Sequence, residues 1–252
     1  MSKSVFFFDI DNTLLYKNEI PKSTLESLNL LKEKGHYIYI CTGRPEILIK
    51  GILKLFDFDG CIVSNGGACY INTTQQFELY LDNNKVEEVI KEVLRNSDTY
   101  SLLTTTNIVT YDPTNEMFIN YLGNFPMMEK CDRNYHLEKN IKSFVIHPKD
   151  LSIYTNKFNE EEFLEVNKYG YELLSKEYSK GTACKYIIEK LNVDSSYGFG
   201  DEVNDLSMFS SVDISVAMGN ACDELKSIAT YQTKNVWEDG IQYALKNILK
   251  VI

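Results

Sequence analysis

The stretch VFFFDIDNTL, residues 5–14, decides the fold of this chain. Its first four residues form a short continuous apolar run, which is typical of a parallel β-strand buried on both faces. Two carboxylates, Asp9 and Asp11, follow that strand directly. In open α/β sheets ligands bind beyond the carboxyl ends of the strands, so both acids are expected in a binding crevice. Because carboxylates this close repel each other, the pair favours a hard divalent cation with oxygen ligands. A helix N-cap would explain one acid, but not both together with Thr13.

Strand and helix patterns alternate on both sides of residues 81–179. After the strand Val5–Phe8, the first part predicts a helix at Thr24–Lys34, which a Ser23/Glu26 capping box begins. A strand at Tyr37–Cys41 follows. Residues 42–45 then open a helix that ends near Phe56, and a strand is predicted at Cys61–Val63. The last part predicts helices at Thr182–Leu191, Leu206–Ser210, Cys222–Ala229 and Gly240–Leu249, and strands at Tyr197–Phe199, Ile214–Ala217 and Tyr231–Thr233. This alternation indicates a parallel α/β sheet.

The regular alternation of strands and helices stops between these two parts. The expected elements there are helices at Lys85–Arg95 and Glu116–Leu122 and strands at Ser101–Thr104, Ile108–Tyr111, Ser143–His147 and Glu172–Ser175. This block is typical of an inserted α+β domain. The predicted fold is therefore α/β, with a doubly wound, Rossmann-like parallel sheet formed by residues 1–81 and 179–252 and an inserted α+β cap domain at residues 82–178.

Two further motifs follow predicted strands, and a lysine precedes a predicted helix. In Thr42-Gly43-Arg44, a hydroxyl and backbone N–H groups at a helix N-terminus form a phosphate cradle, although a threonine cap with a glycine turn is also common. The segment GDEVND, residues 200–205, brings more carboxylates to the same edge, where Asp201 could complete a metal site with Asp9. An acidic helix start explains Glu202, but explains a third acidic cluster poorly. Lys180 would pair with Asp9 and a substrate phosphate, whereas Lys185 is expected to be a solvated surface charge.

Taken together, these residues resemble the four motifs of the haloacid-dehalogenase (HAD) superfamily. The match consists of DxDxTL at residues 9–14, the threonine Thr42, the lysine Lys180, and GDxxND at residues 200–205. Asn65-Gly66, Thr42-Gly43-Arg44, AMGNA at 217–221 and EDG at 238–240 look like the Cof-type subgroup, which carries a large inserted α/β cap. The resemblance covers roughly residues 4–80 and 179–250, and no motif can be transferred to the insert.

The resemblance implies a mechanism for the acids. Asp9 would be the nucleophile that forms an aspartyl-phosphate, and Asp11 the general acid and then the general base. The family binds Mg²⁺ through positions that correspond to the Asp9 carboxylate, the Asp11 backbone carbonyl and Asp201, with Asp205 supporting these ligands. The presence of an acid at position 11 disfavours the carbon–halogen chemistry of the family's dehalogenase branch.

The resemblance also implies the phosphate-binding residues. Thr42 and Lys180 would hold the phosphoryl oxygens and would count with the two aspartates as catalytic residues. Gly43 and Arg44 would bind the substrate beside them, and Asn204 would contact the phosphoryl oxygens or Lys180. Mg²⁺ and Lys180 would then neutralise a pocket in a chain whose net charge is −10.

The implied function is hydrolysis of a small-molecule phosphate ester, with sugar phosphates as the first expectation. A phosphomutase that uses the same nucleophile remains an alternative, as does a non-enzymatic, phospho-receiver-like regulatory module. The net charge argues against a nucleic-acid partner. No apolar stretch is long enough for a signal peptide or a membrane span, and the six scattered cysteines suit reduced thiols, so a cytoplasmic location is expected. The sequence leaves the oligomeric state open.

Overall fold

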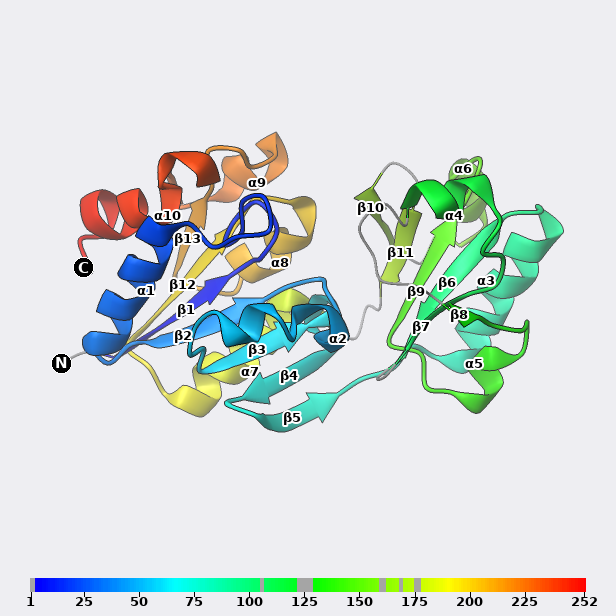
Figure 1. Cartoon of the computed structure of the whole chain (residues 1–252), viewed down its shortest axis with the longest axis horizontal. Helices are drawn as coiled ribbons and strands as arrows, with labels where there is room; N and C mark the ends of the chain where they lie inside the picture. Colours follow the sequence, from blue (N-terminus) through cyan, green and yellow to red (C-terminus); the bar gives the residue numbers. More distant parts are fainter. Residues whose placement is uncertain (1–2, 105–106, 122–128, 159–161, 168–169, 175–177) are drawn as a thin grey trace. The chain divides into compact units, whose positions relative to one another are not determined.

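The computed structural model describes residues 3–104, 107–121, 129–158, 162–167, 170–174 and 178–252. The chain forms two compact units. The core unit consists of Met1–Glu78 together with Tyr178–Ile252, and the inserted unit consists of Leu79–Glu177. The chain leaves the core unit after strand β5 (Thr74–Glu78) and re-enters it before helix α7 (Lys180–Leu191) (Figure 1).

The core unit is built on an eight-stranded sheet in the order β14-β13-β12-β1-β2-β3-β4-β5. The strands from β14 to β3 are parallel, which confirms the predicted α/β core, while β4 and β5 add an antiparallel hairpin at the edge. The strands other than β5 are β1 (Ser4–Phe8), β2 (Tyr37–Cys41), β3 (Gly60–Val63), β4 (Ala68–Ile71), β12 (Ser195–Gly200), β13 (Ile214–Ala217) and β14 (Tyr231–Gln232).

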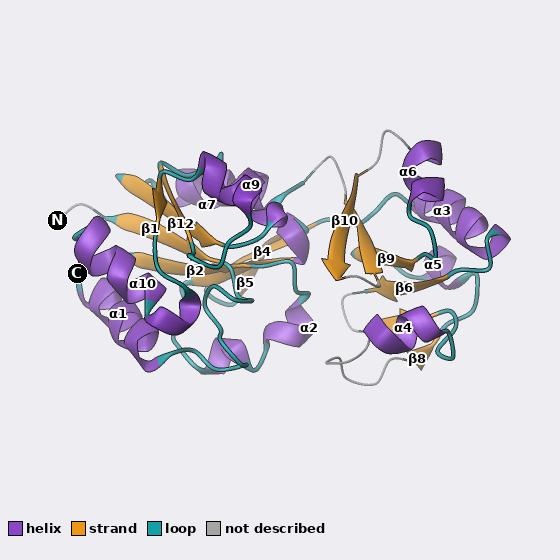
Figure 2. Cartoon of the chain, turned by 90° about the horizontal axis from the view of Figure 1, so that it is seen from above, coloured by secondary structure: helices purple, strands orange, loops and turns teal. Residues whose placement is uncertain are grey.

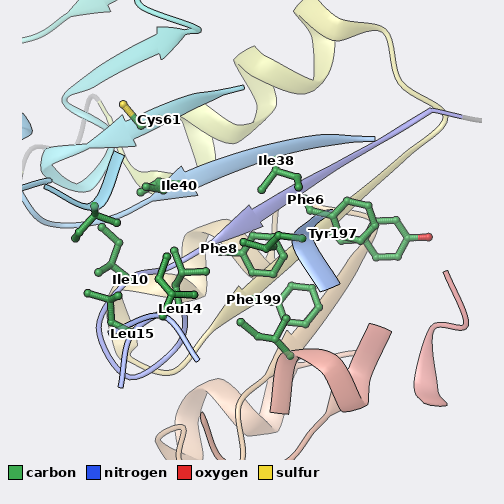
Figure 3. Close-up of a cluster of buried hydrophobic side chains, with 14 of the residues drawn as sticks. Phe6, Phe8, Ile10, Leu14, Leu15, Ile38, Ile40, Cys61, Tyr197 and Phe199 are labelled. Carbon is green, nitrogen blue, oxygen red and sulfur yellow. The ribbon is translucent and has the colours of Figure 1, made fainter. Parts of the chain in front are cut away.

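Helices cover both faces of the core sheet because β1 is apolar on both sides. Helices α1 (Lys22–Glu33) and α10 (Gly240–Tyr243) lie on one face, and α7 and α9 (Asp223–Ile228) on the other (Figure 2). Phe6 and Phe8 belong to the cluster on the α1 face, where their rings stack on Tyr197 and Phe199 with centroids 4.4 and 4.8 Å apart (Figure 3). Phe7 belongs to the cluster on the α7 face. The short apolar run is thus buried on both sides, as its composition predicted.

The inserted unit is a six-stranded mixed sheet in the order β10-β11-β9-β6-β7-β8. Phe144 and Ile146 of β9 pack with Val89 of α3 in a separate hydrophobic cluster. The insert is therefore α+β, as predicted. Its elements are α3 (Asn83–Arg95), β6 (Thr99–Leu103), β7 (Ile108–Thr110), α4 (Glu116–Tyr121), β8 (Glu129–Lys130), α5 (Tyr135–Glu138), β9 (Ser143–His147), α6 (Ser152–Lys157), β10 (Glu162–Asn167) and β11 (Gly170–Leu174). The expected element ends at Leu122 and Ser175 lie outside the described residues.

The start of the first helix differs from its prediction. The prediction of a capping box at Ser23 is wrong, because α1 begins at Lys22, directly after Pro21. The fixed φ of proline suits a helix start, so Ser23 lies inside the first turn and its hydroxyl donates to Asp239. A capping box is present instead at α7, between Ser179 and Thr182.

Two other helices also differ from their predictions. The helix expected from residue 42 to Phe56 is reduced to α2 (Glu46–Ile49) and a 3-10 turn at Ile52–Lys54. Pro45 disfavours helical backbone at the residue before it, so the helix begins only after the proline. The last helix is α10 followed by a π-helical segment, Ala244–Ile248. The remaining core helix is α8 (Leu206–Phe209). In the described part of the chain, no helix has the length and apolar character needed to cross a membrane.

Candidate active site

Polar residues end the three central strands of the core sheet. Asp9 follows β1, Thr42 follows β2 and Asp201 follows β12, and these strands are parallel neighbours in the order β12-β1-β2. The ladder continues past β1, because the Asp9 N–H donates to the Phe199 carbonyl oxygen at 2.9 Å. The side chains of Asp9, Thr42 and Asp201 are all buried. The carboxyl edge of the sheet therefore holds two acids and a hydroxyl at adjacent positions.

Lys180 brings a buried cation to this edge. It is the first residue of α7, and its Nζ lies 2.6 Å from Asp9 Oδ1 and 2.6 Å from Asp205 Oδ1. Burial alone lowers the pKa of Lys180, but the carboxylates of Asp205 and Asp9 outweigh burial and raise it above the ordinary value. Gly181 lets the helix start come this close, since a Cβ there would lie 2.2 Å from the Ser207 carbonyl oxygen.

Three acids form a cluster around this lysine. Asp9, Asp201 and Asp205 each place a carboxylate oxygen within 4.8 Å of the others. Asp205 is fully engaged, because Oδ1 accepts from Lys180 and Oδ2 accepts from the N–H groups of Asp201 and Glu202 at 3.0 and 3.2 Å. Asp201 Oδ1 accepts from the Thr13 hydroxyl at 2.7 Å. Among the described residues, one oxygen of Asp9 and one of Asp201 accept no hydrogen bond, which leaves them for a further ligand.

The electrostatics of the cluster favour a cation. Burial raises the pKa of Asp9 from 3.8 to about 7, although Lys180 opposes this shift. Burial also raises the pKa of Asp201 to about 8, and the charge of Asp9 adds to that effect. Both shifts mean that two ionised carboxylates are unfavourable here without further positive charge. The buried oxygen donors fit a hard divalent cation, which accepts carboxylate ligands in such sites.

The Asp11 carboxylate lies with Arg44 instead of with the acid cluster. Arg44 donates from Nε to Asp11 Oδ2 at 2.8 Å and from its terminal nitrogen to Asp11 Oδ1. This is a bidentate pair, a geometry in which the planar guanidinium matches both carboxylate oxygens. The Asp11 side chain is 56% exposed. The structure therefore brings together two residues that the sequence had placed in the same site without predicting their contact.

Gly43, which follows Thr42, packs against the amides of Asn65 and Asn204. The Thr42 hydroxyl accepts from the Arg44 N–H at 3.1 Å, so it closes a small turn before α2 and is not at a helix N-terminus. A Cβ on Gly43 would lie 3.0 Å from Asn65 Oδ1 and 3.3 Å from Asn204 Nδ2. A side chain at position 43 would therefore press on these two amides, which pack closely on the Thr42 turn.

Two residues with direct contacts at the edge were not predicted as site residues. Thr13 holds Asp201 through its hydroxyl, and its place in the DxDxTL stretch was the available signal. Asn65 accepts from Asn204 Nδ2 at 3.0 Å. In the sequence, Asn65-Gly66 contributes only to the resemblance to the Cof-type subgroup, and its contact joins residues 139 positions apart.

Comparisons with known proteins agree with this geometry. A family model described as haloacid dehalogenase-like hydrolase matches residues 6–245. The chain is 28% identical to YkrA of Bacillus subtilis (strain 168), over 98% of each chain. It is 26% identical to the 5-amino-6-(5-phospho-D-ribitylamino)uracil phosphatase YitU of the same organism, over 94% of each chain. The solved structure of the HAD subclass IIB sugar phosphatase BT4131 is 26% identical, with a TM-score of 0.88 over 99% of this chain and 100% of that chain.

The family model spans both parts of the core unit and the insert between them. The match to the solved structure likewise covers the core unit and the insert. The inserted mixed sheet matches the cap domain of the Cof-type, or IIB, subgroup. The chain therefore belongs to the haloacid dehalogenase-like hydrolase family, in its Cof-type subgroup with a cap domain, and is a phosphatase of that family, that is, a phosphoric monoester hydrolase.

Proposed function

We propose that this phosphatase is magnesium-dependent, that it hydrolyses small phosphorylated metabolites, and that Asp9 is its nucleophile. The observation that carries the proposal is the position of Asp9. Its carboxylate is buried, one oxygen accepts from Lys180 at 2.6 Å, and the carboxylates of Asp201 and Asp205 lie within 4.8 Å. Lys180 and the three acids make this edge suited to a phosphate ester and a divalent cation together.

The proposed reaction has two steps. In the first, the Asp9 carboxylate oxygen attacks phosphorus while the bond to the leaving oxygen breaks, and Asp11 gives its proton to that oxygen. In the second, Asp11 takes a proton from water as the water oxygen attacks the phosphorus of the aspartyl-phosphate. The acyl-phosphate bond then breaks, which restores the Asp9 carboxylate and releases inorganic phosphate.

The proposed metal ligands are the Asp9 carboxylate, the Asp11 backbone carbonyl and Asp201. Asp205 supports them through its hydrogen bonds to the Asp201 N–H and to Lys180. Bound Mg²⁺ supplies positive charge beside Asp9 and the phosphoryl oxygens.

Thr42, Gly43, Arg44, Lys180 and Asn204 are the proposed phosphate-binding residues. Arg44 has a second effect, because it engages both oxygens of Asp11. Release of Asp11 from this guanidinium frees its carboxylate for the leaving oxygen. An anionic oxygen of the substrate competes with Asp11 for Arg44, so substrate binding favours the release of Asp11.

The substrate class is supported by the relatives. YitU is named as a phosphatase of a phosphoribitylamino-uracil, and BT4131 as a sugar phosphatase. Both names describe small phosphorylated metabolites, and we propose sugar phosphates as the first compounds to test. We further propose that the inserted domain, residues 82–178, selects among substrates and limits the access of water. The six unpaired cysteines support a reducing, cytoplasmic location.

A phosphate-release screen tests the proposal. The purified protein is incubated with a panel of phosphorylated sugars and other phosphorylated metabolites, with Mg²⁺ and with excess chelator. We expect phosphate release with Mg²⁺, none in chelator, and poorer recovery with Zn²⁺ than with Mg²⁺. Asp9→Asn is the inactive variant, and Asp57→Asn is its control, because the Asp57 side chain is 93% exposed. Full activity in chelator would refute the metal assignment, and transfer of phosphate only to an added sugar phosphate would indicate a phosphomutase.

A further inference from the structure

The loop after β3 has an unusual backbone. Ser64, Asn65 and Gly66 have consecutive positive φ angles of 50°, 52° and 98°. For residues with a Cβ this left-handed conformation is unfavourable, although less so for asparagine than for serine. The Ser64 hydroxyl does not explain it, because within the described residues this buried oxygen has no hydrogen-bond partner. Strained backbone of this kind persists where the surrounding structure holds it, often at functional sites.

The loop is held between two parts of the candidate site. The Ser64 N–H donates to the Arg44 carbonyl oxygen at 3.0 Å, and the Asn65 N–H donates to the Thr42 carbonyl oxygen at 3.1 Å. On its other side the loop packs on the start of α7. A Cβ on Gly66 would lie 2.1 Å from the Ser179 carbonyl oxygen, one residue before Lys180. The loop therefore contacts both segments that carry the proposed phosphate-binding groups.

The side chain of Asn65 adds a third connection. Its Oδ1 accepts from Asn204 Nδ2 at 3.0 Å, and both amides pack on Gly43. This contact uses one N–H of the Asn204 amide and so limits the orientations of the rest of that group. Asparagine is also one of the few residues with a side chain that tolerates left-handed backbone. Asn65 thus combines a permitted conformation with an amide that reaches Asn204.

We propose that Asn65 is a positioning residue of the phosphate-binding site. It orients the carboxamide of Asn204, while its strained loop holds the Thr42-Gly43-Arg44 turn against the start of α7, where Lys180 lies. This inference rests on the proposed function, because it assigns Asn65 to the site at which the phosphoryl group binds. It adds a residue that acts through Asn204 instead of touching the substrate.

The test compares two asparagine-to-glycine substitutions. Asn65→Gly removes the amide but keeps a residue that adopts positive φ without strain. Asn192→Gly is the matched control, since Asn192 is an exposed left-handed residue at the end of α7 with φ 48°. Activity is measured with p-nitrophenyl phosphate and Mg²⁺, and inorganic phosphate serves as the competing ligand. If Asn65→Gly does not fold, Asn65→Ser replaces it, because its hydroxyl is too short to reach Asn204.

We expect Asn65→Gly to lower kcat/KM by about tenfold or more, within the range seen for directly contacting side chains. KM and the inhibition constant of phosphate should rise more than kcat falls, and Tm should stay close to that of Asn192→Gly. In an Asn204→Ala background, Asn65→Gly should lower kcat/KM by less than about twofold, because its partner is already absent.

The outcomes separate this inference from the proposed function. No hydrolysis by the unaltered protein would refute the proposed function and this inference with it. Hydrolysis that Asn65→Gly and Asn192→Gly reduce equally would refute the role of Asn65 alone. The same conclusion would follow if the losses of Asn65→Gly and Asn204→Ala multiplied in the double variant, because Asn65 would then act independently of Asn204.

Discussion

Lys180 and Asp205 form a fully buried ion pair, with Nζ 2.6 Å from Oδ1. The same Nζ lies 2.6 Å from Asp9, so one cation serves two carboxylates. The other oxygen of Asp205 accepts from the N–H of Asp201. Asp205 therefore connects the lysine to the segment that carries the third acid of the cluster, and the pair holds the start of α7 to the loop after β12.

Removal of Lys180 should destabilise the metal-free protein. Lys180→Met leaves two buried carboxylates without their cation, and the loss of one partner of a buried pair typically costs about 3–5 kcal/mol. We expect a loss of that size in the free energy of unfolding, measured by urea titration in chelator. Lys185→Met is the control, because Lys185 is an exposed lysine of the same helix and its loss should change stability by less than about 0.5 kcal/mol. Equal stabilities of the two variants would contradict the role of the buried pair.

The stability of the metal-free protein should depend on pH through Asp9 and Asp201. Burial raises the pKa of these groups from 3.8 to about 7 and about 8. Between about pH 4 and pH 8 the folded state therefore binds more protons than the unfolded state, so these two groups lower the free energy of unfolding as pH rises. Asp201→Asn removes one of them, and we expect it to be more stable than the unaltered protein at pH 8 in chelator.

Mg²⁺ should reverse the order of stability of these two proteins at pH 8. Mg²⁺ should raise the Tm of the unaltered protein at pH 8 and leave that of Asp201→Asn nearly unchanged, because a proposed ligand is missing. Thermal unfolding at pH 5 and pH 8, each with chelator and with Mg²⁺, measures both effects. Parallel pH profiles of the two proteins, with equal stabilisation by Mg²⁺, would show that Asp201 is not a ligand.

The Asp9→Asn variant should show no turnover and should form no phosphoenzyme. The substitution keeps the shape of the side chain but removes the nucleophilic oxygen charge and one proposed metal ligand. Mass spectrometry of acid-quenched protein, after incubation with an aryl phosphate and Mg²⁺, measures the phosphoenzyme. Label on a serine, histidine or cysteine, or near-normal activity of Asp9→Asn, would contradict the proposed nucleophile.

Asp11→Asn should separate the two steps of the reaction. General acid–base catalysis typically raises the rate by about 10²–10⁴-fold, so turnover should fall by about that factor. An aryl phosphate has a good leaving group and needs little protonation, so the first step should lose less than the second. A phosphorylated Asp9 should then accumulate, which the same mass spectrometry detects. Its absence, with slow turnover, would argue against Asp11 as the base of the second step.

Deletion of residues 83–177 behind a short linker should leave a folded core. Among the residues that the structure describes, the hydrophobic clusters of the core unit contain no residue of the insert, and the cluster of the inserted unit contains none of the core. We expect the shortened protein to keep stabilisation by Mg²⁺ and to lose selectivity across the substrate panel. Circular dichroism, thermal unfolding with and without Mg²⁺, and the panel itself measure this. An unfolded core would refute the separate-domain prediction, and an unchanged substrate ranking would refute the selective role of the insert.

The sequence was informative where structure is local. A strand buried on both faces must be apolar throughout, so the run before Asp9 predicted β1 and its burial on both sides. The hairpin of β4 and β5 was not predicted, because the latter, TQQFE, is polar and half-exposed and lacks a clear alternation. The helix after Thr42 was overestimated because Pro45 limits the backbone before it.

The sequence by itself determined which residues end the central strands, since the end of a strand is set by its own residues and their neighbours. Only the tertiary structure decided which side chains meet there. Arg44 engages Asp11, Asn65 holds Asn204, and Lys180 joins Asp205 as well as its predicted partner Asp9. Such contacts depend on how strands and helices pack and on which rotamers that packing allows, and neither is encoded in the spacing of residues along the chain.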